Sequence, residues 1–295
     1  MYKARSLFAG RMLAVGLCLV LLSGTAAFGE IFHYPDVSAT SVEYSMITES
    51  SFTDSGALFG PPMLTGHETL RYESGMNFGS YSAGAGDFDI TDGKLYMKLE
   101  AKTGARIAAV TLNEIGAYAI GGVGGTSATQ VSVSTLGLSV AVNRVRDDSG
   151  NILSVDGPVV IGQMRYHLVT DGDDTDGQAI PSENDIPLGP GVSPVTFPIS
   201  THGQGTWTGY AVIDLIGALQ GTPWEGHDVM EATLVFDNML ITQSEAGTFA
   251  YIDKKRLWIT PEPGTVMLLS IGGLGLAGLS WCKRRRSTLK DKDVA

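Results

Sequence analysis

Apolar and polar residues alternate with a period of two over much of the chain. In residues 94–100, Leu95, Met97 and Leu99 lie on one side of the backbone, with lysine, tyrosine and glutamate between and around them. Because successive side chains of a strand point to opposite faces, this alternation is typical of half-buried β-strands. The same pattern and strand-forming composition predict further strands at 42–48, 68–73, 106–114, 130–134, 136–143, 159–169, 206–213, 232–237 and 248–252.

Two details of this pattern can be checked one residue at a time. In the strand at 136–143, the alternation predicts a buried face made of Leu136, Leu138, Val140 and Val142. Turn-forming residues separate the predicted strands, and we expect turns at Asp92-Gly93, Thr103-Gly104, Ser149-Gly150-Asn151, Asp156-Gly157-Pro158 and Ala246-Gly247.

Roughly ten or more short strands at this spacing predict an all-β fold, an antiparallel β-sandwich or jelly roll. One short helix is predicted at 214–220, where Asp214 can cap the first turn and Gly221 can end the helix. Residues 170–193 are rich in Asp, Gly and Pro and are predicted to form one long loop.

The first 29 residues have the layout of a secretory signal peptide. Lys3, Arg5 and Arg11 form a basic start, and residues 12–22 form an apolar run that is too short to span a bilayer. Small residues follow, and cleavage by signal peptidase fits after Ala27 or after Gly29. We therefore expect residues 1–29 to direct export and then to be removed.

A second apolar segment lies near the other end of the chain. Residues 264–282 carry no charged side chain, and as a helix they would be about 28 Å long, close to the thickness of the bilayer interior. The cluster Lys283, Arg284, Arg285 and Arg286 follows at once, and such basic flanks stay on the cytoplasmic side. The pattern predicts a transmembrane helix at 264–282, a single exported domain at 30–260 and a cytoplasmic tail at 287–295.

Pro261, Glu262 and Pro263 stand directly before this apolar segment, and the two prolines keep the triplet extended. The order of Pro-Glu-Pro, apolar helix and arginine-rich cluster in residues 261–286 closely resembles the PEP-CTERM sorting signal of bacteria that make exopolysaccharide. The resemblance implies recognition of the triplet by an exosortase, a membrane protease of transpeptidase type. It also implies either anchoring or release at the cell surface or in the extracellular matrix of a biofilm, and the sequence leaves that choice open.

The exported region is strongly acidic. Residues 30–260 contain 11 Lys and Arg against 28 Asp and Glu, a net charge of −17, whereas the whole chain carries −11. This charge argues against nucleic acid as a partner. Both cysteines, Cys18 and Cys282, lie in the two apolar segments, so the exported region must be stabilised by its packed core and has no disulfide.

An acidic stretch is the candidate metal site, and Ca²⁺ is the one cofactor that the sequence suggests. Gly-containing loops with hard oxygen ligands suit Ca²⁺, and the candidate ligands here are Asp171, Asp173, Asp174, Asp176 and Glu183. Gly172 stands where an EF-hand would have its first ligand, and Pro181 interrupts the loop. The alternative is a solvated acidic loop that binds no ion.

Aromatic residues near the predicted strands are candidates for a sugar-binding platform, because a sugar ring stacks on an aromatic face. The four candidates are Trp207, Tyr210, Trp224 and Trp258. The alternative is that these side chains belong to the core. Lys254-Lys255-Arg256 is a basic run that we interpret as a solvated strand edge, with lipid headgroups or acidic polysaccharide as other contacts.

No motif in the exported region predicts catalysis: there is no G-x-S-x-G elbow, no cysteine nucleophile and no H-E-x-x-H pair. Our first hypothesis is a structural or interaction protein. The second is a carbohydrate-binding module for exopolysaccharide, which predicts aromatic side chains aligned on one sheet face. The third is a glycan-active enzyme, which predicts two carboxylates that converge in a cleft.

Overall fold

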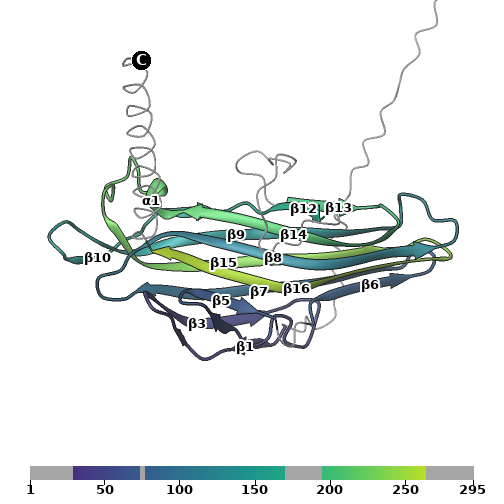
Figure 1. Ribbon diagram of the computed structural model, residues 1–295, viewed down its shortest axis with the longest axis horizontal. Coiled ribbons are helices and arrows are strands. Elements are labelled where there is room, and N and C mark those ends of the chain that lie inside the picture. Colours follow the sequence, from purple (N-terminus) through teal and green to yellow (C-terminus); the bar gives the residue numbers. More distant parts are fainter. Residues whose placement is uncertain (1–28, 74–76, 170–194, 264–295) are drawn as a thin grey trace, which may run out of the picture.

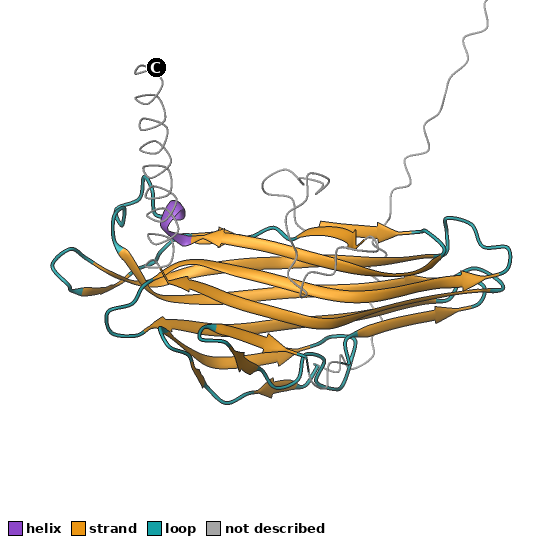
Figure 2. Ribbon diagram, viewed as in Figure 1, coloured by secondary structure: helices purple, strands orange, loops and turns teal. Residues whose placement is uncertain are grey.

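A computed structural model of the chain describes residues 29–73, 77–169 and 195–263. The strands of these residues form two antiparallel sheets that lie face to face (Figure 1). Nearly all regular structure is strand, and helix is confined to one short segment of the described chain (Figure 2). The predicted all-β fold, an antiparallel β-sandwich, is confirmed.

Sheet A has the path β1-β3-β7-β15-β9-β10, with β2 paired to β3 and with β11 and β13 paired to β9. Its strands are β1 (Ile31–His33), β2 (Val37–Ser38), β3 (Val42–Ser50), β7 (Phe88–Ala101), β9 (Gln130–Arg146), β10 (Ile152–Ser154), β11 (Val159–Ile161), β13 (Val195–Ile199) and β15 (Asp228–Gln243).

Sheet B has the path β12-β14-β8-β16-β5-β4, with β6 also paired to β16. Its strands are β4 (Met63–Thr65), β5 (Thr69–Tyr72), β6 (Gly79–Ala83), β8 (Ile107–Gly122), β12 (Arg165–Val169), β14 (Gly203–Asp214) and β16 (Thr248–Pro263). Several strands of both sheets are long, with 16 residues in β8, β15 and β16 and 17 in β9, so the expectation of short strands is wrong for the centre of the sandwich.

The core lies between the sheets and follows the predicted alternation. Leu95, Met97 and Leu99 of β7 are completely buried. On β9 the buried face includes Leu138, Val140 and Val142, but Leu136 is 37% exposed, contrary to the prediction. The reason is an irregularity in the ladder: Asp237 pairs with Gly137 while Asn238 pairs with Thr135, so Leu136 is the extra residue of a bulge.

The segment predicted as one strand at 159–169 is divided between the two sheets. β11 pairs with β9 in sheet A, and β12 pairs with β14 in sheet B. The chain crosses the edge of the core at Gly162, where a Cβ atom would lie 2.7 Å from Leu138 and 2.9 Å from Ile213. A glycine is therefore needed where the backbone passes this close to core side chains.

The turn expected at Asp92-Gly93 is also wrong, because both residues lie inside β7. Gly93 is required here for space. A Cβ atom at this position would lie 2.4 Å from the ring of Phe78 and 2.9 Å from the ring of Phe59. Gly93 thus marks a place where aromatic side chains press on the backbone of sheet A.

The predicted helix is present as α1 (Leu215–Ala218). Asp214 caps it, since its carboxylate accepts a hydrogen bond from the backbone N–H of Gly217 at 2.8 Å. Gly221 follows with a φ of 71°, in the left-handed region that favours glycine. Leu215 and Leu219 are buried and attach this segment to the core.

Three predicted features lie outside the described residues: the signal peptide, the acidic loop and the segment 264–295. Within the described ranges, no helix has the length and apolar character needed to cross a membrane. The predicted transmembrane helix at 264–282 therefore stays a prediction.

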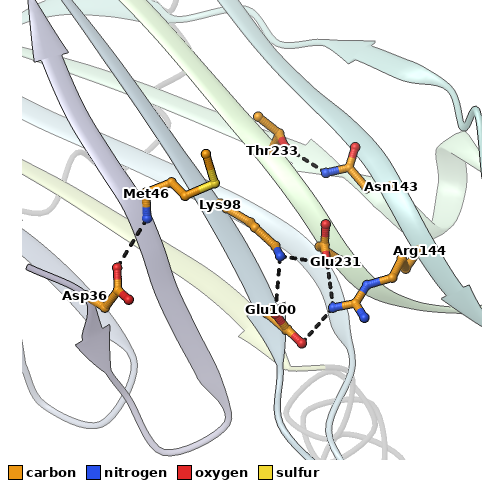
Figure 3. A network of polar contacts seen from close by, with 8 residues as sticks. All are labelled: Asp36, Met46, Lys98, Glu100, Asn143, Arg144, Glu231 and Thr233. Carbon is orange, nitrogen blue, oxygen red and sulfur yellow. Dashed lines mark hydrogen bonds and ion pairs between the residues drawn. The ribbon is translucent and has the colours of Figure 1, made fainter. Parts of the chain in front are cut away.

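Ion pairs cross three strands on the outer face of sheet A (Figure 3). Glu231 of β15 lies opposite Glu100 of β7 and opposite Arg144 of β9. Arg144 contacts Glu231 at 2.5 Å and Glu100 at 2.6 Å, and Lys98 contacts the same two carboxylates at 3.0 and 3.4 Å. Burial alone would raise the pKa of Glu100, but the hydrogen bonds and charges of Arg144 and Lys98 together outweigh burial and lower the pKa. Two cations thus compensate the repulsion of two paired glutamates.

Asp228, at the start of β15, is held by two arginines. It contacts Arg106 at 2.8 Å and Arg146 at 2.7 Å, one arginine on each carboxylate oxygen. Burial would raise the pKa of Asp228, but the hydrogen bonds and charges of the two arginines together outweigh burial, and the pKa is lowered. The ionised carboxylate therefore stabilises the folded chain.

We predict a pH dependence from this lowered pKa. The contribution of Asp228 to the free energy of unfolding is present above the pKa of an unfolded aspartate, about 4, and is lost as the pH falls through the lower pKa of the folded state. Asp228→Asn should therefore be destabilising near pH 7, and its difference from the parent should shrink on acidification. Chemical denaturation at several pH values measures this, with the exposed Asp156→Asn as control. A difference that is constant with pH would contradict the assignment.

Gly116 of β8 lies between Trp207 of β14 and Lys254 of β16 in the register of sheet B. Trp207 is completely buried. A Cβ atom on Gly116 would lie 2.0 Å from the backbone oxygen of Asp253 and 2.3 Å from the indole ring of Trp207. The tryptophan therefore packs directly on a backbone without a side chain.

We predict that Gly116→Ala lowers the free energy of unfolding by about 2–3 kcal/mol or more, because overpacking a core forces its neighbours to move. Denaturant unfolding followed by tryptophan fluorescence measures the change. The matched control is Gly137→Ala on β9, whose Cβ would meet its nearest neighbour, Asp237, at 3.8 Å. Equal stability of the two variants would contradict the close contact between Trp207 and the backbone of Gly116.

Candidate functional site

The outer face of sheet B carries two aromatic residues in one row across the strands. Tyr210 of β14 pairs with Asn113 of β8, and Asn113 pairs in turn with Trp258 of β16. The row extends to Arg165 of β12 beside Tyr210 and to Arg71 of β5 beside Trp258. Residues paired across strands share a face, so Tyr210 and Trp258 lie on one surface, two inter-strand spacings or about 10 Å apart. We call these five residues the sheet B row.

A cavity of about 300 Å³ lies at the Trp258 end of the sheet B row. Glu73 holds the arginines near it, with its carboxylate 3.2 Å from Nε of Arg71 and 2.7 Å from Nε of Arg256. The guanidinium of Arg256 lies 6.0 Å from the ring of Trp258. The lining residues are Thr65, Thr69, Arg71, Asn113, Arg256, Trp258 and Thr260. The cavity therefore combines an aromatic face with fixed hydrogen-bond donors.

Asn113 adds an acceptor in the middle of the sheet B row. Its Oδ1 atom is buried and lacks a hydrogen-bond partner among the residues that the structure describes. A buried acceptor without a partner costs free energy and is commonly satisfied by a water or a ligand. A sugar hydroxyl has the chemistry to fill this role, since it both donates and accepts.

A larger cavity of about 650 Å³ adjoins Tyr210. It lies between β11, β14 and α1, and its polar lining comes from Gln163, Arg165, Tyr210 and Asp214. Burial raises the pKa of Tyr210, and the nearby charge of Glu262 adds to this effect. The phenol is thus neutral and can donate a hydrogen bond. Cavities consequently lie at both aromatic residues of the sheet B row.

Two of the four predicted platform residues lie outside the sheet B row. Trp207 belongs to the core, with its ring edge-on to Tyr166 at a centroid distance of 6.0 Å. Trp224 packs against the core as a partly buried residue and has His227 at 6.0 Å. The sequence alternative of a core role is therefore correct for Trp207, and only Tyr210 and Trp258 share a row.

The sorting triplet forms the end of β16. Pro261, Glu262 and Pro263 pair with Val110, Ala109 and Ile107 of β8. Pro261 is buried, and Glu262 accepts a hydrogen bond from the Thr111 hydroxyl at 2.9 Å. The triplet is extended, as predicted, but it is part of the sandwich, whereas the expected boundary of the exported domain was residue 260.

The candidate calcium ligands Asp171, Asp173, Asp174, Asp176 and Glu183 lie outside the described residues, as do Lys283, Arg284, Arg285 and Arg286. Among the residues that are described, no group of three or more His, Cys, Asp or Glu side chains could hold a metal ion.

Lys254 corrects the interpretation of the basic run, because it is 1% exposed and points into the core. It contacts Glu114 of β8 at 2.5 Å, and the same carboxylate accepts a hydrogen bond from Asn238 of β15. Sequence reasoning missed this buried cluster. The signal was the alternation in β16, where Ala250 and Ile252 face inward and the next inward position is Lys254.

Comparison with known proteins gives three findings. Residues 260–286 match the family model of the PEP-CTERM protein-sorting motif. No curated protein matches the chain. A solved structure of TmCBM61 in complex with β-1,4-galactotriose is similar over 81% of this chain and 92% of that chain, with 9% identity and a TM-score of 0.16. The resemblance of residues 261–286 is thus confirmed: the chain carries a PEP-CTERM sorting motif, the mark of an exported protein that an exosortase processes.

Proposed function

We propose that the protein is a non-catalytic β-sandwich of the cell surface or extracellular matrix, delivered there by an exosortase. The observation that carries this proposal is the sorting motif at 260–286, which continues directly from β16. The acidic surface of the exported region suits a soluble interaction protein. An exported domain has no access to cytoplasmic cofactors, and we therefore propose binding as its function.

The position of the triplet in sheet B adds a condition to sorting. A protease that reads an extended peptide needs free backbone groups along it, but β8 pairs with β16 up to Pro263. The exosortase must therefore meet the motif before the end of β16 docks, or after these last residues separate from β8. The two prolines weaken this end of the ladder because they donate no backbone hydrogen bond.

A second candidate function is carbohydrate binding on the outer face of sheet B. The sheet B row supports it, with aromatic side chains at Tyr210 and Trp258 and an unsatisfied acceptor at Asn113 between them. Sugar sites combine stacking faces with a few oriented polar groups. Arg71 in the row and Arg256 beside it, both held by Glu73, suit an acidic polysaccharide, of the kind that an exopolysaccharide producer secretes.

For the first proposal we predict the ends of the mature protein in its host. Mass spectrometry should find an N-terminus after Ala27 or Gly29 and a C-terminus near Pro261–Pro263. Replacing both prolines, Pro261→Ala with Pro263→Ala, should leave the C-terminal segment uncleaved. Pro198→Ala, at a strand proline far from the motif, is the matched control and should be processed normally. A parent protein that keeps residues 264–282 at the cell surface would contradict exosortase cleavage.

For the second function we predict that Trp258→Ala and Tyr210→Ala each weaken binding to the host's exopolysaccharide by about tenfold or more, because truncating a buried aromatic contact commonly costs this much. Affinity electrophoresis or calorimetry measures the change. Tyr81→Ala is the control: this tyrosine is 56% exposed on β6 of the same sheet. Equal binding by the parent and all three variants, or no binding by the parent, would remove the sheet B row from consideration.

A further inference from the structure

Three polar side chains from three strands meet between the sheets. Lys254 of β16, Glu114 of β8 and Asn238 of β15 are each at most 1% exposed. Nζ of Lys254 lies 2.5 Å from Oε2 of Glu114. Nδ2 of Asn238 lies 3.1 Å from Oε1 and 3.3 Å from Oε2 of the same carboxylate. Glu114 therefore holds an amine and a side-chain amide next to each other.

Aromatic rings enclose the amine. Nζ of Lys254 lies 4.7 Å from the ring centroid of Phe78, 5.0 Å from that of Phe236 and 5.3 Å from that of Phe59. The space for two of these rings exists because Gly93 has no side chain. Burial lowers the pKa of Lys254, although the charge of Glu114 acts in the opposite direction. The enclosure thus favours a neutral amine, which is a nucleophile, over a bare ammonium ion.

The amide of Asn238 is oriented by its hydrogen bonds. Its nitrogen donates to Glu114 and, at 3.1 Å, to the hydroxyl of Tyr166. Its Oδ1 atom has no hydrogen-bond partner among the described residues. The nitrogen that would leave in an acyl transfer therefore already contacts a proton carrier, and the carbonyl is not needed for any other contact.

We propose that Lys254 and Asn238 form an intramolecular amide bond, with Glu114 as the proton carrier. Glu114 accepts a proton from the ammonium of Lys254, and the neutral Nζ attacks Cγ of Asn238 to form a tetrahedral intermediate. The Nζ–Cγ bond stays and the Cγ–Nδ2 bond breaks. Glu114 passes this proton to Nδ2, which leaves as ammonia, and Glu114 then takes the second proton that Nζ must lose to become an amide nitrogen. Glu114 is therefore protonated at the end of the reaction. One amine and one primary amide become one secondary amide and ammonia, and the reaction needs no oxidant and no cofactor.

This bond would join the two sheets covalently, because Asn238 belongs to sheet A and Lys254 to sheet B. It would also replace a buried ion pair, which is costly to desolvate, by a neutral group. Lys254 lies on the strand that ends in the sorting triplet. A force applied to the C-terminal segment would act along β16. The cross-link at Lys254 would bear this force and would keep the part of β16 before Lys254 from separating from the sheet.

The test uses the full chain, produced in a cell without an exosortase, denatured and digested after glutamate. Cleavage after Glu231 and Glu245 places Asn238 in fragment 232–245 and Lys254 in fragment 246–295, because Glu262 is followed by Pro263 and is not cleaved and no glutamate follows it. We expect mass spectrometry to find these fragments joined, with a combined mass about 17 Da below their sum, because one ammonia is lost in acyl transfer. Separate fragments of full mass, from a chain shown to be folded by circular dichroism, would overturn the proposal.

Variants separate the cross-link from an accidental loss of ammonia elsewhere. Lys254→Arg removes the nucleophile but keeps a cation, and its fragments should be separate. Glu114→Gln keeps both reacting groups and should lower the joined fraction at least tenfold. Lys255→Arg, at the exposed neighbouring lysine, is the matched control and should leave the joined fraction unchanged. Joined fragments in Lys254→Arg would assign the bond to another residue and would refute the role of Lys254.

Discussion

A bulge in β16 decides which of its side chains face the core, and the rest of the structure depends on it. Lys254 pairs with Gly116 and Arg256 with Ile115, so Lys255 is an extra residue in the ladder with β8. An extra residue reverses the alternation of faces. The extra residue therefore allows both Lys254 and Leu257, three positions later, to point into the core. Without the bulge, the lysine and Leu257 would lie on opposite faces of sheet B.

The same bulge connects three regions that differ in chemistry. It places Lys254 in the aromatic enclosure with Glu114, and it turns Trp258 to the outer face, where Trp258 joins the sheet B row. It also sets the register in which Glu262 pairs with Ala109. A single strand thus contributes to the packed centre, to the candidate binding surface and to the sorting signal. Bulges often lie next to functional sites because they redirect side chains in this way.

The sequence predicts the fold well where the alternation is regular, because burial on one face fixes it. Leu95, Met97 and Leu99 lie as expected. The predictions are wrong at irregularities, which single-sequence patterns do not reveal. Leu136 is exposed by a bulge, and Gly93 serves packing where a turn was expected. The strand predicted at 159–169 changes sheets because Gly162 allows the crossing.

Candidate functional residues are harder to predict because their proximity is created by strand pairing. Asn113 becomes the centre of the sheet B row only through its register with Tyr210 and Trp258. Lys254 and Asn238 are on different sheets, and no spacing in the chain indicates that one carboxylate contacts both. The sorting motif was predictable because it is read as a linear segment, so its chemistry is contained in consecutive residues.

The register of β16 is therefore the central claim, and disulfide formation tests it most directly. In a chain with Cys18 and Cys282 replaced by serine, cysteines at the paired positions Ala109 and Glu262 have Cα atoms about 5 Å apart and side chains on one face, which is within the range that a disulfide bridges. Peptide mapping of the chain exported by a cell without an exosortase, which keeps residue 262, should find the Ala109→Cys/Glu262→Cys pair oxidised. Free thiols in the folded chain, or a bridge that forms only when the second cysteine is moved to position 261, would contradict the bulge and the docked sorting triplet.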